Sequence, residues 1–120
     1  MGTSYRLDLA AAELSLGERA EAERELDRVL TMVNRMIASG VERYATYELR
    51  AKAYALKGRG DDAMRDLNKA AALGWRGVWW ARHQPYLAGL ESRSDYQALL
   101  ARVAASNERL IERVQSDPAL

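Results

Sequence analysis

Only a few side chains of this sequence could take part in catalysis or hold a metal ion. His83 is the only histidine, and its neighbours Arg82, Gln84 and Pro85 give no spacing typical of metal ligands. A catalytic histidine also needs a nucleophile or a carboxylate as partner, and no motif supplies one. Cysteine is absent, which excludes a thiol nucleophile and a cysteine-based zinc site.

Asp61 and Asp62 are adjacent carboxylates at the start of a predicted helix. Such a pair could bind a metal or transfer protons. Negative charge at this position is also favoured by the helix dipole, and we interpret the pair in that way. The sequence contains no glycine-rich phosphate loop, nucleophile elbow or paired-histidine helix. We therefore predict that the protein is not an enzyme and has no catalytic residue, cofactor or metal site.

Three tryptophans, Trp75, Trp79 and Trp80, lie close together with Arg76 and Arg82 between or beside them. Interleaved aromatic and basic residues can stack on bases or contact a peptide, and they can equally close the end of a small helical core. On helical spacing Trp75 and Trp79 share a face, whereas Trp80 points elsewhere. We expect Trp75 and Trp79 in the core and Trp80 in contact with a protein partner.

Length and composition indicate one domain, residues 1–120, because 120 residues that are 48% hydrophobic can bury a core. The 18 basic and 17 acidic side chains are interleaved, so we predict no basic stripe and do not expect nucleic-acid binding. No apolar run reaches the ~18 residues of a membrane span, and the N-terminus lacks a signal-peptide pattern. We expect a soluble, cytoplasmic domain without a membrane partner.

Apolar residues recur at the spacing of amphipathic helices and nowhere alternate with a period of two, so we predict an all-α fold. The expected helices cover residues 4–16, 18–39, 41–57, 60–73 and 93–115. Between the last two, one or two short helices should be interrupted near Pro85. Ser92, three residues before Asp95, is the predicted N-cap of the last helix.

An internal repeat relates the first two predicted helices to the next two at a constant offset of 41 residues. The corresponding residues are Ala10 and Ala51, Gly17 and Gly58, Ala22 and Ala63, Leu26 and Leu67, and Val29 and Ala70. Facing small residues let two helix axes approach closely, and glycine suits the turn between them. Repeated helix pairs predict a solenoid of antiparallel helices.

The repeat resembles the tetratricopeptide repeat family. The second unit carries residues typical of that motif's aromatic, small and turn positions: Tyr47, Ala51, Tyr54, Gly58, Ala63, Leu67 and Ala70. The first unit matches less fully, because Arg6 and Glu13 stand where aromatic residues are usual. Both units lack the closing proline, and their offset exceeds the family's usual length of about 34 residues by one heptad.

Residues 85–103 resemble the segment that closes such repeat arrays in bacterial multidomain regulatory and signalling proteins. The two resemblances imply an α-α superhelix with repeat units at about 4–39 and 41–74. A terminal segment at about 75–115 would end in a capping helix. The chain could therefore be part of a larger regulator.

The resemblance also implies a function, namely a protein-protein interaction module that binds a protein or peptide on its concave surface. In the family the first helix of each pair lines that surface. By position this implies the protein-binding residues Leu7, Ala11, Leu14, Glu48, Lys52 and Ala55, to which Trp80 is added as an exposed aromatic residue.

The alternative is a self-association domain with a structural role. Helices 18–39 and 93–115 are longer than their neighbour, and their overhanging ends remain apolar, which is typical of an interface. The predicted self-association residues are Val33, Met36, Ile37, Leu110, Ile111 and Val114. These residues would either pair two chains as a homodimer or let residues 107–115 fold back onto helix 18–39.

Overall fold

The computed structural model describes residues 3–117, and every regular element in that range is helical. The elements are α1 (Thr3–Ser15), α2 (Arg19–Ala38), α3 (Tyr44–Leu56), α4 (Gly60–Ala72), α5 (Val78–His83), the 3-10 helix η1 (Pro85–Leu90) and α6 (Ser94–Ser116). The prediction of an all-α fold is confirmed. The predicted interruption near Pro85 is the boundary between α5 and η1. None of the helices in the described range has the length and apolar character needed to cross a membrane.

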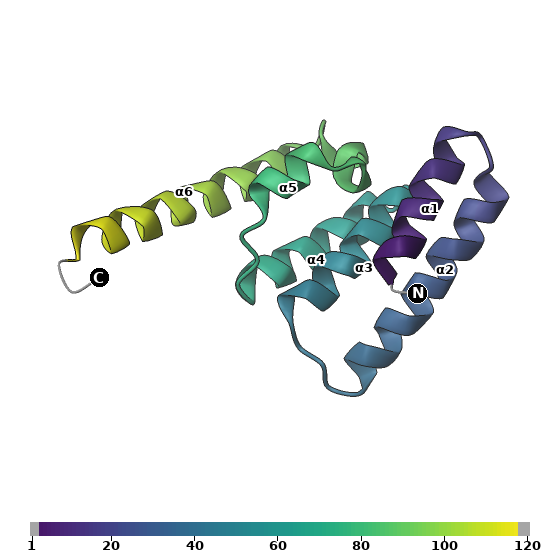
Figure 1. The fold of residues 1–120 in the computed structure, drawn as a ribbon, viewed down its shortest axis with the longest axis horizontal. Coiled ribbons are helices and arrows are strands. Elements are labelled where there is room, and N and C mark those ends of the chain that lie inside the picture. Colours follow the sequence, from purple (N-terminus) through teal and green to yellow (C-terminus); the bar gives the residue numbers. More distant parts are fainter. Residues whose placement is uncertain (1–2, 118–120) are drawn as a thin grey trace.

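Two helical hairpins, α1–α2 and α3–α4, form the body of the protein, and α3 packs against both helices of the first hairpin (Figure 1). The turns contain Gly17 and Gly58, whose φ angles of 77° and 79° suit glycine because it has no Cβ. In each turn a backbone hydrogen bond between residues five apart ends the first helix. Glu18 N donates to Glu13 O at 2.8 Å, and the equivalent bond of the second hairpin measures 2.9 Å.

The core of the two hairpins is built from the repeated small and large residues. Ala10, Ala22, Ala51 and Ala63 are all fully buried, and so are Leu26 and Leu67. Tyr54 is also buried, as the repeat predicted. Because alanine adds little bulk at these positions, the helices of each hairpin can pack closely.

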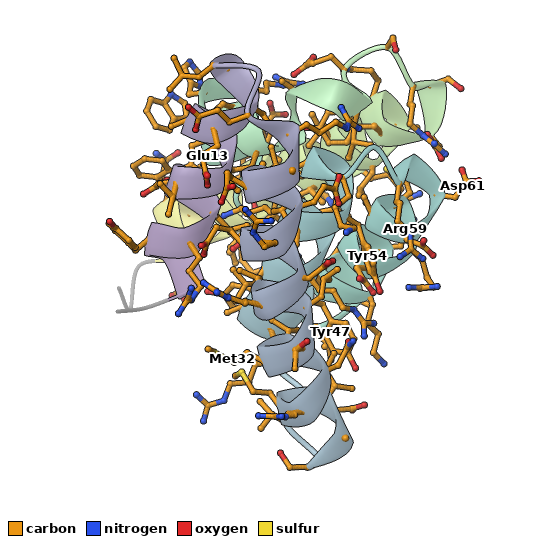
Figure 2. All side chains as sticks on the ribbon, turned by 90° about the vertical axis from the view of Figure 1, so that its right-hand side faces the viewer. Glu13, Met32, Tyr47, Tyr54, Arg59 and Asp61 are labelled. Atoms are coloured by element: carbon orange, nitrogen blue, oxygen red, sulfur yellow. The ribbon has the colours of Figure 1, made fainter. Side chains whose placement is uncertain are left out.

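Glu13 is an acidic exception to the apolar packing of the first hairpin. Its side chain is half-buried on α1 (Figure 2), and one carboxylate oxygen is enclosed without a hydrogen-bond partner. Burial, followed by repulsion from Glu25 and Glu21, raises the pKa of the Glu13 carboxyl above its usual value.

A buried ion pair fastens the second hairpin. Arg50 on α3 donates from Nε and from Nη2 to the two carboxylate oxygens of Asp66 on α4, at 2.7 and 2.8 Å. Asp66 is 1% exposed, so its charge is compensated by this fork and by Arg65, whose Nε lies 3.8 Å away, and not by water. Asn34 on α2 accepts a third bond from Arg50 at 3.0 Å, and these bonds to Asp66 raise the pKa of the guanidinium. Arg50 therefore links three helices, α2, α3 and α4.

Tyrosine rings and cations alternate around this ion pair. The Arg50 guanidinium lies 5.6 Å from the Tyr47 ring centre and 5.9 Å from that of Tyr54. The Arg59 guanidinium lies 4.7 Å from the centre of the Tyr54 ring, and both residues are labelled in Figure 2. Both rings are buried, so these cation–π contacts add to the stability of the hairpin.

The terminal segment crosses back over the first helices of the hairpins. η1 packs against α3 and α1, while α6 contacts α4 and α5 at its N-terminal half. The C-terminal half of α6 extends beyond the other helices (Figure 1). This arrangement leaves the apolar residues near Val114 without cover from the described part of the chain.

The start of α6 corrects one prediction, because its N-cap is Arg93 and not Ser92. Arg93 pairs with Asp95 at 2.9 Å and with Asp61 of α4 at 2.8 Å. The Asp95 carboxylate also accepts a bond from the Tyr96 backbone N at 2.9 Å. Ion pairs thus hold this helix start in place of a serine cap.

Tyr96 is fully buried at the start of α6, and its hydroxyl has no hydrogen-bond partner. Burial, assisted by the negative charge of Glu91, raises the pKa of the hydroxyl to about 12, from 10.0. The folded state therefore binds this proton more tightly than the unfolded state. Its contribution to stability is complete below pH 10.0 and is lost as the pH rises to about 12.

We expect Tyr96→Phe to remove this alkaline loss, which amounts to about 2–3 kcal/mol. At neutral pH the variant should be more stable by about 1–2 kcal/mol, because a buried hydroxyl without a partner is lost. Urea unfolding of both proteins at neutral and alkaline pH measures this. Tyr5→Phe, at an exposed tyrosine, is the control and should change neither value. An equal alkaline loss in wild type and Tyr96→Phe would contradict the prediction.

Candidate functional site

A groove lies between α1, α3 and the segment that joins α5 to η1. Its volume is about 500 Å³. We call it the α1–α3 groove, and it is lined by Ser4, Leu7, Asp8, Ala45, Glu48, Leu49, Lys52, Gln84 and Tyr86. Leucines form an apolar part of the lining, while carboxylates, an amide, a hydroxyl and an ammonium group supply polar contacts. The groove is therefore amphipathic.

Charged side chains of the α1–α3 groove are held in place by neighbouring aromatic residues. The Trp75 indole N–H donates to the Glu48 carboxylate, and Glu48 lies 3.7 Å from the Lys52 ammonium. Lys52 also lies 5.3 Å from the centre of the Tyr86 ring. The Tyr86 hydroxyl donates to Asp8 of α1, which links η1 to the first helix. Groups ordered in this way lose little side-chain entropy on binding.

The structure brings together three of the six residues that the resemblance implied for a concave surface. Leu7, Glu48 and Lys52 all line the α1–α3 groove, with Leu7 only 2% exposed beneath it. Ala11 and Leu14 are half-buried and lie outside the lining.

The prediction that Ala55 contacts a partner has to be corrected, because Ala55 is buried at 9% exposure and offers no surface to a partner. The reason is η1, which packs on this end of α3. A Cβ atom added at Gly89 of η1 would lie only 3.7 Å from the Ala55 carbonyl oxygen. Asp8 and Tyr86 are groove residues that sequence reasoning missed, and the position of Asp8, one residue after Leu7, was the available signal.

The division of the three tryptophans between core and surface differs from the prediction. Trp75 is buried as expected, but Trp79 is 59% exposed and Trp80 is 60% exposed. The prediction for Trp79 is wrong because α5 begins only at Val78, so Trp75 does not belong to the same helix. Trp79 and Trp80 meet edge to face at 4.7 Å, outside the α1–α3 groove.

The remaining residues considered for catalysis have structural contacts. His83 is exposed and stacks on Trp79 at 4.2 Å, with its Nδ1 2.7 Å from the Trp79 carbonyl oxygen. Asp61 pairs with Arg93 of α6, and Asp62 pairs with Arg59 at 2.6 Å. No cluster of three or more histidine or acidic side chains in the described part of the chain could hold a metal ion.

The predicted self-association residues do not form one surface. The prediction that Val33 contacts a second chain has to be corrected, because Val33 is fully buried within its own chain. Met36 and Ile37 are half-buried. On α6, by contrast, the three predicted residues Leu110, Ile111 and Val114 are 53%, 55% and 49% exposed. Fold-back of residues 107–115 onto helix α2 is therefore not seen; α6 points away from it (Figure 1).

The chain was compared with protein-family models, curated proteins and solved structures. No family model matches the chain, and neither does any curated protein or solved structure. The functional interpretation therefore depends on the geometry of the described residues.

Proposed function

We propose that this protein is a protein-protein interaction module, a superhelix of the tetratricopeptide repeat type that binds a peptide segment in the α1–α3 groove. The order of the elements supports this, because two hairpins with equivalent glycine turns follow each other and end in a long helix. The observation that carries the proposal is the meeting of Leu7, Glu48 and Lys52 in one groove, since all three were expected on the concave face.

The chemistry of the groove indicates the kind of segment it binds. η1 covers the end of α3 at Ala55, so the open part is short and suits an extended peptide of a few residues. An apolar side chain would pack on Leu49, which is half-buried in the lining. The carboxylate of Asp8 would accept hydrogen bonds from peptide N–H groups or from a basic side chain. No catalytic step is proposed. In the larger proteins that the chain resembles, such a module would serve a cytoplasmic bacterial regulator.

The test fills the groove without disturbing the core. Ala45 is exposed and lines the groove, so Ala45→Trp should block peptide entry and leave the stability nearly unchanged. Peptides selected from a random library on the wild-type protein are expected to bind with micromolar affinity and to bind Ala45→Trp at least roughly tenfold more weakly. Isothermal titration calorimetry measures both affinities.

Ala20→Trp is the matched control, because Ala20 is exposed on α2 and lies outside the groove lining. This variant should bind the selected peptides like the wild type. Failure to select any peptide, or equal binding by Ala45→Trp, would overturn the proposal.

Self-association is the second candidate, and the exposed α6 residues favour it. Leu110, Ile111 and Val114 form an apolar stripe on the part of α6 that extends beyond the body. A second copy could cover this stripe. Sedimentation over a wide concentration range decides the matter, since a dimer that forms through α6 should dissociate on dilution and should be lost in Leu110→Glu/Ile111→Glu.

A further inference from the structure

A second surface with different chemistry lies between α4 and α6. Two adjoining hollows of about 420 and 250 Å³ share Arg76, Ser106 and Arg109. Arg102 lines the first hollow, Arg113 lines the second, and no acidic residue lines either of them. We call this surface the α4–α6 cleft. It shares no residue with the α1–α3 groove.

The ion pairs among residues 3–116 include none of the four arginines of the α4–α6 cleft. Arg102 donates to the Asn68 amide oxygen at 3.3 Å, Arg109 donates to the Ser106 hydroxyl at 3.2 Å, and Arg76 donates only to backbone carbonyls. Guanidinium groups that meet only neutral acceptors retain their capacity for paired bonds to carboxylates.

The arginines follow one flank of α6. At about 3.6 residues per turn, positions 102, 106, 109 and 113 lie on the same side of the helix, and Glu112, three residues after Arg109, lies on the face next to it. From Arg102 to Arg113 the stripe extends about 17 Å at ~1.5 Å per residue. This is the length of roughly three helical turns of a bound partner.

Apolar side chains border the arginine stripe. Val103 and Ala71 line the cleft, and Leu110 lines its outer end. Val114, one turn after Leu110, continues the apolar border along the exposed half of α6, whereas Ile111 is exposed on the side away from the arginines. A partner that fits this surface needs an apolar face with acidic side chains beside it.

We propose that the α4–α6 cleft binds an acidic amphipathic helix of a partner protein. Its apolar face packs on Leu110 and Val114, and its carboxylates pair with the arginine stripe. Helices laid into grooves use the same combination of apolar anchors and flanking charges.

Two other occupants fit less well. In a symmetric antiparallel pair of α6 helices each flank meets the same flank of the second copy, so Arg109 and Arg113 would face arginines. A single nucleic-acid strand would satisfy the arginines but would leave Leu110 and its neighbours without a partner, and the cleft lining contains no aromatic ring on which bases could stack.

The test uses two labelled synthetic helices of about 18 residues, long enough to cover the ~17 Å stripe. They have the same apolar face, and one carries glutamates on its flank where the other carries glutamines. Fluorescence anisotropy with the full chain at low salt should show the glutamate helix bound at least roughly tenfold more tightly. Its affinity should fall as salt is added, because these charges are exposed.

Arg109→Glu/Arg113→Glu should weaken binding of the glutamate helix by at least roughly tenfold. Arg76→Gln/Arg102→Gln removes charge without reversing it and should weaken binding less. Both should keep the wild-type circular dichroism melting curve, since the ion pairs among residues 3–116 are kept. Arg19→Glu/Arg35→Glu is the control of equal charge on exposed arginines of α2, and it should bind like the wild type.

Several results would overturn the proposal. One is equal binding of the glutamine helix, and another is equal weakening by the α2 control, which would indicate net charge alone. Tighter binding of a labelled single-stranded oligonucleotide through Arg109 and Arg113 would assign the cleft to nucleic acid. Ala45→Trp should bind the acidic helix normally, so failure of the α1–α3 groove proposal remains distinguishable from failure of this one.

Discussion

Replacement of Arg50 by alanine is expected to lower the free energy of unfolding by about 3–5 kcal/mol. The change would leave the Asp66 carboxylate, at a site that is 1% exposed, with only the longer 3.8 Å contact to Arg65 Nε. It would also remove the guanidinium between the Tyr47 and Tyr54 rings and its bond to Asn34. Chemical unfolding monitored by circular dichroism measures the loss.

Two controls separate the buried charge from the side chain itself. The double variant Arg50→Met/Asp66→Leu should recover most of the stability, because it removes both charges together. Arg24→Ala breaks an exposed pair with Glu21 and should cost no more than about 1 kcal/mol. A loss for Arg50→Ala as small as that for Arg24→Ala would show that Asp66 reaches solvent.

Trp75→Ala is expected to cost about 3–5 kcal/mol, because the largest fully buried side chain of the protein would be replaced by a cavity. The indole is closely enclosed: a Cβ atom added at Gly77 would lie 2.9 Å from its Nε1. Loss of the indole would also free Glu48, so the α1–α3 groove should lose order together with the core. Thermal and urea unfolding measure the stability.

Trp79→Ala is the matched control, because Trp79 is a tryptophan of the same segment that is 59% exposed. Its cost should stay within about 0.5 kcal/mol. Equal losses at the two tryptophans would contradict the placement of Trp79 outside the core and would support the sequence prediction that both residues close the core.

Local sequence patterns were enough to predict the helices and the cores of the two hairpins. Helix periodicity is a local property, because each backbone bond joins residues four apart, and so α1 to α4 and α6 begin and end close to the predicted residues. Gly17 and Gly58 could be predicted as turns because few other residues adopt their positive φ angles. Ala51 and Ala63 were recognisable because the repeat places small residues where two helices approach.

Which distant side chains meet depends on how the helices pack, and local patterns could not predict it. Trp79 could not be placed from helical spacing, because residues 75–77 form no helix and the turn they make sets the direction of α5. Ala55 is buried because η1 returns to α3, and no local pattern specifies where a short connecting segment packs. The arginine stripe could not be recognised because the sequence interleaves opposite charges and because its members come from two elements, since Arg76 lies in a turn and the other three lie on α6. Such contacts depend on how elements pack against one another, whereas periodicity reports only which residues of one element share a face.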